Sequence, residues 1–68
     1  MRGAIKSLKL DNGYGFIRLP EGGKDVFFHI RDLESGLAFD DSLQERLVEF
    51  EIVHSERGQR AANVRAVQ

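Results

Sequence analysis

The sequence predicts an all-β domain, and three observations support this prediction. The seven glycines are spread along the 68 residues, so that few stretches could propagate a helix. Apolar and polar side chains alternate with a period of two in five short segments. Turn signals such as Asn12-Gly13 separate these segments. Five short strands at this spacing indicate a small barrel or a sandwich, and closure into a barrel would hide the strand edges.

The first two strands are predicted on either side of the Asn12-Gly13 turn, over residues 4–10 and 14–19. In the first strand, Ile5 is expected to face the core. The second strand has one face with Tyr14, Phe16 and Arg18, and another with Gly15, Ile17 and Leu19. Because side chains alternate along a strand, the aliphatic face belongs in the core and the aromatic face outside it.

The third strand is predicted over residues 25–30, after a turn at residues 20–23. Its inward face is expected to carry Val26, Phe28 and Ile30, and its outward face Phe27 and His29. A long acidic loop is expected from residue 31 to about residue 45. One short helical turn is expected within it, near residues 30–33.

The last two strands are predicted over residues 47–53 and 61–67, with a turn at residues 54–59 between them. Glu49 and Glu51 alternate with apolar residues in the first of these strands and are expected to face outward. The predicted core consists of Ile17, Leu19, Val26, Phe28, Val48, Phe50 and Ile52.

Length and composition restrict the class of function. A chain of 68 residues has a marginal core, which disfavours an enzyme with a deep pocket. The absence of cysteine excludes disulfides and cysteine-bearing zinc sites. No apolar run approaches the roughly 18 residues that span a bilayer, and the N-terminal residues do not resemble a signal peptide. The sequence therefore predicts a cytoplasmic protein that is not an enzyme and has no cofactor, no metal, no membrane partner and no small-molecule substrate.

Charge is unevenly distributed along the chain, although the net charge is only −1. Residues 1–31 hold six basic and three acidic side chains, or +3. Residues 32–56 hold one basic and eight acidic side chains, or −7, and residues 57–68 hold three arginines, or +3. If the fold brings the two ends together, the domain is expected to have one basic face and one acidic face.

The predicted core leaves several aromatic rings on the outside of the sheet. Tyr14, Phe16 and Phe27 must then point outward, and His29 points the same way. The cations expected around these rings are Lys6, Lys9, Arg18 and Arg57. Exposed rings flanked by cations suit the stacking of unpaired bases and contact with phosphates. The alternative is an alternation displaced by one residue, which would bury an arginine and expose two aliphatic side chains.

Two segments resemble the two ribonucleoprotein motifs of the cold-shock domain. Residues 12–17, Asn-Gly-Tyr-Gly-Phe-Ile, resemble the first motif, and residues 26–29, Val-Phe-Phe-His, resemble the second. Residues 3–6 and 57–64 are similar to the opening strand and the closing segment of the family. The resemblance covers nearly the whole chain. It implies that residues 1–68 form one domain, a five-stranded antiparallel OB-fold barrel that binds single-stranded RNA or DNA.

The resemblance also implies a set of contact residues. The side chains expected to stack on bases are Tyr14, Phe16, Phe27, His29 and, in the long loop, Phe39. The side chains expected to contact phosphate are Lys6, Lys9, Arg57 and Arg60. The chain departs from the family at Ser7, Leu8 and Ile30, where the family usually carries aromatic rings. Each missing ring removes a stacking surface, so we expect weaker binding than in a relative that has all of them.

The function predicted from the sequence is low-specificity binding of single-stranded RNA or DNA by a monomer or weak dimer. By trapping unpaired segments, such a protein would act as an RNA chaperone or a regulator of gene expression. The alternative is a protein-interaction or structural barrel whose affinity for nucleic acid is weak or lost, which the missing rings favour. A third interpretation is that the domain is a module of a longer chain.

Overall fold

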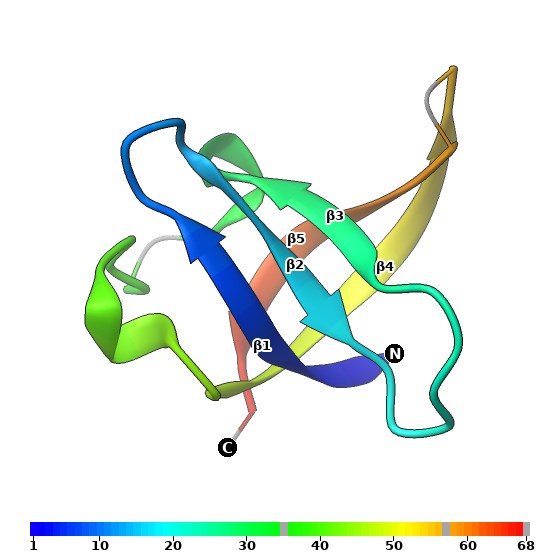
Figure 1. Ribbon diagram of the computed structural model, residues 1–68, viewed down its shortest axis with the longest axis horizontal. Helices are drawn as coiled ribbons and strands as arrows, with labels where there is room; N and C mark the ends of the chain where they lie inside the picture. The colour runs from blue at the N-terminus through cyan, green and yellow to red at the C-terminus, as the bar shows by residue number, and fades with distance from the viewer. Residues whose placement is uncertain (35, 57, 68) are drawn as a thin grey trace.

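The alternating segments form five strands that close into a barrel. The computed structural model describes residues 1–34, 36–56 and 58–67 and is shown in Figure 1. The strands are β1 (Arg2–Lys9), β2 (Tyr14–Arg18), β3 (Val26–His29), β4 (Leu47–Ser55) and β5 (Gly58–Ala66). Two single-turn 3₁₀ helices, η1 (Ile30–Asp32) and η2 (Asp41–Leu43), lie in the long connection between β3 and β4. The all-β class predicted from the sequence is confirmed.

The strand order around the closed barrel is β1-β2-β3-β5-β4. Four of the neighbouring pairs are antiparallel, but β3 and β5 run parallel, with Phe27 opposite Arg60. The expectation of a purely antiparallel barrel is therefore wrong. The reason is one of parity: strand direction cannot alternate all the way around a ring of five, so one neighbouring pair must run parallel.

The core lies inside this ring, and its fully buried side chains come from all five strands and from η2. They are Ile5, Ile17, Val26, Phe28, Leu43, Val48, Phe50, Ala61 and Val64. Five of the seven predicted core residues belong to this set. The other two, Leu19 and Ile52, are partly buried and pack against it.

Two predictions about inward-facing residues need correction. Ile30 is 43% exposed because β3 ends at His29 and the chain turns into η1 before another inward position is reached. Conversely, Leu43 is fully buried although it lies in the segment predicted to be an acidic loop. The η2 turn, capped by the Asp40 carboxylate accepting a bond from the Ser42 amide at 2.9 Å, directs this leucine into the core.

Gly15 allows the closest approach between the sheet and its core. It faces inward on β2, directly opposite Phe28 on β3. A Cβ added to Gly15 would lie 2.7 Å from the Ser7 carbonyl oxygen and 2.8 Å from a carbon of the Phe28 ring. Any side chain at this position would have to displace both neighbours.

Within the described ranges, no helix is long and apolar enough to cross a membrane.

Substitution of Gly15 by alanine should lower the free energy of unfolding by about 1–3 kcal/mol, because the methyl group overpacks the space beneath Phe28. Urea denaturation measures the change. Leu47→Ala is the control, since this side chain on β4 is mostly exposed and its loss should cost less than about 0.5 kcal/mol. A Gly15→Ala protein as stable as the wild type would show that the Phe28 ring does not confine this position.

Candidate nucleic-acid interface

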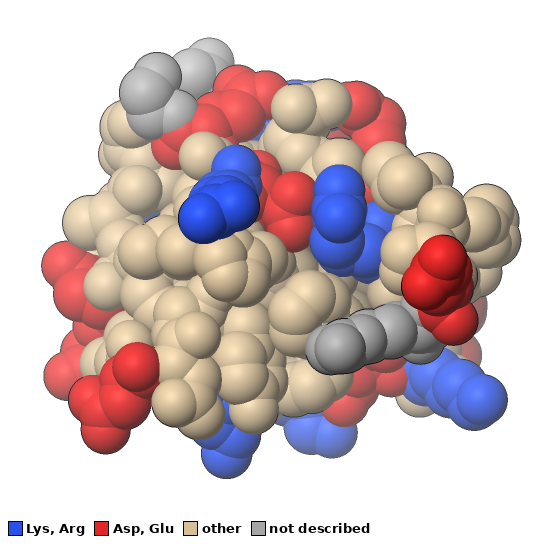
Figure 2. Space-filling model, turned by 90° about the horizontal axis from the view of Figure 1, so that it is seen from above, with Lys and Arg blue, Asp and Glu red and all other residues tan. Residues whose placement is uncertain are grey.

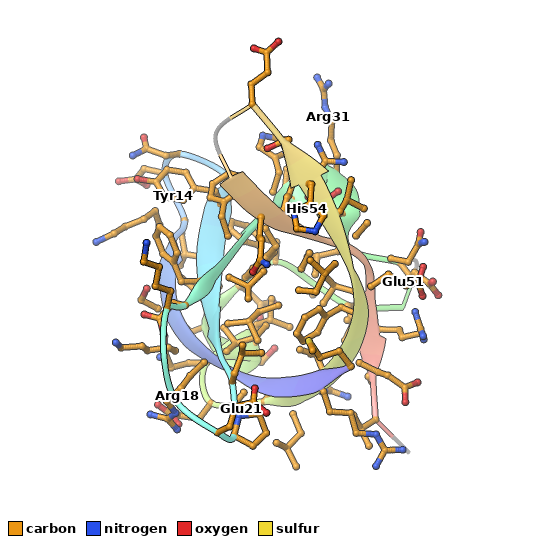
Figure 3. All side chains as sticks on the ribbon, turned by 90° about the vertical axis from the view of Figure 1, so that its right-hand side faces the viewer. Tyr14, Arg18, Glu21, Arg31, Glu51 and His54 are labelled. Atoms are coloured by element: carbon orange, nitrogen blue, oxygen red, sulfur yellow. The ribbon has the colours of Figure 1, made fainter. Side chains whose placement is uncertain are left out.

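The outward side chains of β2 and β3 form a cluster of aromatic rings. Phe16 lies opposite Phe27, and Tyr14 lies opposite His29, so that all four project from the same side of the sheet. The ring centroids of Tyr14 and Phe27 are 5.5 Å apart, and Phe16 lies 5.9 Å from Tyr14 and 6.0 Å from Phe27. We call Tyr14, Phe16, Phe27 and His29 the aromatic face. Figure 3 shows Tyr14 outside the barrel, on the side opposite to Glu51.

The β1 strand brings cations to the edge of the aromatic face. A β-bulge between Ile5 and Ser7 makes Lys6 an additional residue in this strand, and Lys6 is exposed. After the bulge, Ser7 pairs with Phe16 and Lys9 pairs with Tyr14. Directly opposite residues share a face of a sheet, so Ser7 and Lys9 lie on the same side as the rings.

Three hollows adjoin the Phe27 ring. The largest, of about 590 Å³, separates the aromatic face from the β4–β5 hairpin, which Figure 1 shows projecting from the barrel. Its lining is Phe16, Phe27, Ser55, Glu56, Gln59 and Arg60. A second hollow of about 500 Å³ continues past Gln59 to Lys24 and Asp25, and a third of about 330 Å³ reaches His29 and Asp32. Phe27 therefore lies at the centre of a grooved surface.

Polar contacts orient two of the predicted site residues. The Arg31 amide donates a hydrogen bond of 3.1 Å to Nδ1 of His29, and the His29 amide donates one of 2.9 Å to Asp32. These reciprocal bonds cap η1. Arg60 lies opposite Phe27, with its Nε 3.5 Å from Oδ2 of Asp32. The structure thus brings His29 and Arg60 next to Phe27, around the third hollow.

Two predicted site residues are not placed on this face. Phe39 is partly buried and packs edge-on against the core ring of Phe28, with centroids 6.3 Å apart. Its proposed stacking on a base stays a prediction. Arg57 lies outside the described residues, so its expected contact with phosphate also stays a prediction.

The three positions without a ring differ in their surroundings. Ser7 is on the side of the aromatic face, as its pairing with Phe16 shows. Leu8 pairs with inward-facing Gly15 and packs against the core. Ile30 is exposed, and its amide donates a bond of 2.8 Å to the Gly13 carbonyl at the end of the β1–β2 turn. Ser7 and Ile30, but not Leu8, are therefore positions where a ring would face solvent.

Sequence reasoning missed the polar residues that line the hollows, above all Asp32 and Gln59. Residues 54–59 were expected to form a turn, whereas β4 continues to Ser55 and β5 starts at Gly58. Ala61 faces inward. Extending the alternation of side chains from Ala61 towards the N-terminus would have placed Arg60 and Gln59 in β5, as part of the β4–β5 hairpin. His29 and Asp32 have the three-residue spacing of a helix-capping pair. This spacing could have indicated that a helical turn begins directly after the aromatic rings of β3.

The expected separation into one basic and one acidic face is wrong for the arginines at the two ends of the chain. Because β1 and β5 both border β4, Arg2 and Arg65 meet the carboxylates of that strand. Arg2 lies 3.1 Å from Glu49, and Arg65 lies 3.3 Å from Glu49 and 3.0 Å from Glu51. Figure 2 shows basic and acidic side chains interspersed over one face of the molecule.

Acidic residues also meet the cations of the aromatic face. The Lys6 Nζ is 3.0 Å from Asp25, which directly precedes β3, and Arg60 pairs with Asp32. A phosphate group would compete with Asp25 for the Lys6 ammonium, whereas the contact of Asp32 is with Nε of Arg60. Binding at this face would therefore exchange one anion for another at Lys6.

Hydrogen bonds on the β4 side lower the pKa of two carboxyl groups. The bond from Arg2 holds the pKa of Glu49 below its ordinary value of 4.5. For Glu51, the bond from Asn63 is the main cause of the lowered pKa, and the bond from Arg65 adds to it. Asn63 occupies a bulge in β5 with a positive φ of 54°, a conformation that asparagine tolerates well.

Comparisons with known proteins agree with these features. The family model described as 'Cold-shock' DNA-binding domain matches residues 1–67. Cold shock protein CspB of Geobacillus stearothermophilus is 44% identical over 63 residues, which cover 93% of this chain and 92% of that protein. Cold shock-like protein CspG of Escherichia coli K12 is 41% identical over 64 residues, covering 94% and 90%. The solved structure of drosophila Unr CSD456 matches with a TM-score of 0.77 and 28% identity; the match covers 98% of this chain and 26% of that one.

The carboxylates on β4 predict how stability depends on pH. Because the pKa values of Glu49 and Glu51 are lower in the folded than in the unfolded chain, both groups stabilise the fold above pH 4.5. This stabilisation should be lost as the pH falls through their folded values. Arg65→Met should lose less stability than the wild type when the pH is lowered. The urea midpoints of variant and wild type should therefore converge at acidic pH. A difference that is the same at neutral and acidic pH would contradict this assignment.

Proposed function

The chain belongs to the 'cold-shock' DNA-binding domain family, and we propose that it binds single-stranded RNA or DNA through the aromatic face. The observation that carries the proposal is the outward cluster of Tyr14, Phe16 and Phe27, with hollows on either side of Phe27. We propose further that residues 1–68 act as one domain of the OB-fold type. No part of the proposed activity requires catalysis.

Base stacking supplies the sequence-independent part of the binding. The rings of the aromatic face support one another laterally, and Phe16 stands at 89° to Tyr14. They present surfaces without needing to be ordered first, which reduces the entropic cost of binding. Stacking contributes roughly 1–3 kcal/mol per base, so two stacked bases give about 2–6 kcal/mol. This corresponds to a Kd no better than about 40 micromolar, so phosphate contacts must supply any further affinity.

The proposed phosphate contacts come from cations around the rings. Among the described residues these are Lys6, Lys9 and Arg60, and Arg57 is the fourth residue of the set. For single strands, log K falls with log salt by about 0.7 for each neutralised phosphate. Three contacts therefore predict a slope of roughly −2. Neither stacking nor phosphate contact reads the base sequence, which supports low sequence specificity.

The proposed cellular role follows from the preference for unpaired nucleotides. A protein that binds only single strands shifts the equilibrium of an RNA hairpin towards its open form. This is RNA chaperoning, and it needs no nucleotide hydrolysis. Opening a hairpin in a messenger would also regulate gene expression.

Phe27 and Phe28 are neighbours in β3 that point in opposite directions, which makes them a matched pair for testing the proposal. Phe27→Leu should weaken the binding of a fluorescently labelled oligo(dT) by roughly 1–3 kcal/mol and leave the urea midpoint nearly unchanged. Phe28→Leu should lower the urea midpoint, because the core loses a fully buried ring, while the folded variant keeps its affinity.

Fluorescence anisotropy at several salt concentrations measures the affinities. The wild type should give a saturable signal that weakens with salt. The absence of such a signal at high protein concentration would favour the alternative of a barrel that does not bind nucleic acid. Equal affinities for the wild type and Phe27→Leu would show that the ligand binds away from the aromatic face.

A further inference from the structure

We propose that Asp32 is a positioning residue of the interface, whose carboxylate orients Arg60 and His29 beside Phe27. This inference rests on the proposed function of the aromatic face. It assigns a role in binding to an acidic side chain that would be expected, from its charge alone, to repel nucleic acid.

One carboxylate oxygen of Asp32 makes both contacts. Oδ2 accepts the hydrogen bond from the His29 amide at 2.9 Å and lies 3.5 Å from Nε of Arg60. The Asp32 side chain is only 11% exposed, so the surrounding protein limits its movement. A charge held this firmly fixes the direction of the groups that bind it.

Arg60 depends on this contact for its orientation. Its Nε is buried and has no hydrogen-bond partner, and among the described residues Asp32 is its ion-pair partner. The side chain as a whole is 42% exposed and lines both the largest hollow and the one that reaches His29. With Nε turned towards Asp32, the terminal nitrogens of the guanidinium are left for a ligand in these hollows.

The Asp32 carboxylate also orients His29. Asp32 receives the His29 amide, and in return Nδ1 of His29 accepts the Arg31 amide at 3.1 Å. A neutral imidazole that accepts at Nδ1 carries its proton on Nε2. The ring is thus held at the rim of the third hollow, with Nε2 as a donor for a base or phosphate.

Backbone contacts on both sides of Asp32 keep η1 against β5. Phe27 pairs with Arg60 before it, and Leu33 pairs with Val64 after it. The Glu34 amide also donates a bond of 2.9 Å to the Val64 carbonyl. Asp32 therefore lies beside the parallel pairing of β3 and β5, where a change in one side chain can alter the aromatic face without opening the core.

Charge and positioning predict opposite effects of neutralising Asp32. In Asp32→Asn the amide oxygen can still accept the His29 bond, but the negative charge beside Arg60 is lost. If only charge mattered, removing an anion near the ligand would tighten oligonucleotide binding. If Asp32 positions Arg60, the affinity for oligo(dT) should fall about threefold to fivefold, as expected for the loss of a partly exposed ion pair.

Glu56→Gln is the control, because Glu56 is an acidic residue that lines the largest hollow from the hairpin. Its neutralisation removes a negative charge near the ligand, so the affinity for oligo(dT) should rise slightly. Tighter binding by Asp32→Asn, at a urea midpoint that shows the variant to be folded, would overturn the proposal.

A double-mutant cycle separates positioning from a general structural effect. In an Arg60→Gln background, Asp32→Asn should no longer weaken binding. An equal loss of affinity in both backgrounds would mean that the effect does not act through Arg60, and it would overturn the proposal.

A second variant covers the case in which Asp32→Asn does not fold. Arg60→Lys keeps the charge but lacks a guanidinium that can face Asp32 and the ligand together, so it should also bind about threefold more weakly. Affinity equal to that of the wild type would overturn the proposal. Failure of the wild type to bind oligo(dT) would instead overturn the proposed function itself.

Discussion

The packing of the Phe28 ring over Gly15 is the constraint on which the rest of the interface depends. The two residues are opposite each other, and a Cβ at position 15 would collide with the ring. This contact fixes which side of β2 and β3 faces the core. Since side chains alternate along a strand, Phe16 and Phe27 are directed outward by the same contact. A slip of one residue would move the rings into the core and the aliphatic side chains into water.

Four of the cations with acidic partners fall into two groups with different roles. Arg2 and Arg65 meet carboxylates of β4 and join both ends of the chain to that strand. Lys6 and Arg60 also have acidic partners, but theirs lie next to the aromatic face. Because a phosphate would replace Asp25 at Lys6 and would meet an Arg60 already paired with Asp32, the net electrostatic gain on binding is smaller than the number of cations implies. Stacking therefore has a larger share in the proposed binding than the charge pattern of the sequence indicates.

The alternation of side chains was sufficient to predict the strands and the outward direction of Phe16 and Phe27, because a period of two leaves few alternatives once one face is apolar. It could not predict what depends on contacts across the barrel. Leu43 is buried by a turn within a polar segment, Phe39 packs on the core, and Asp32 meets Arg60 through the parallel seam. Each of these contacts joins residues far apart in sequence, for which local periodicity carries no information.

The central claim is that ligand binds to the outward side of β2 and β3, and amide chemical shifts during an oligonucleotide titration test it most directly. In ¹H–¹⁵N spectra of the wild type, unlabelled oligo(dT) should cause the largest shifts at the amides of β2, β3 and η1. The amides of Glu49 and Glu51, on the other side of the barrel, should change little. The largest shifts at β4, or small shifts of similar size throughout the chain, would contradict the account.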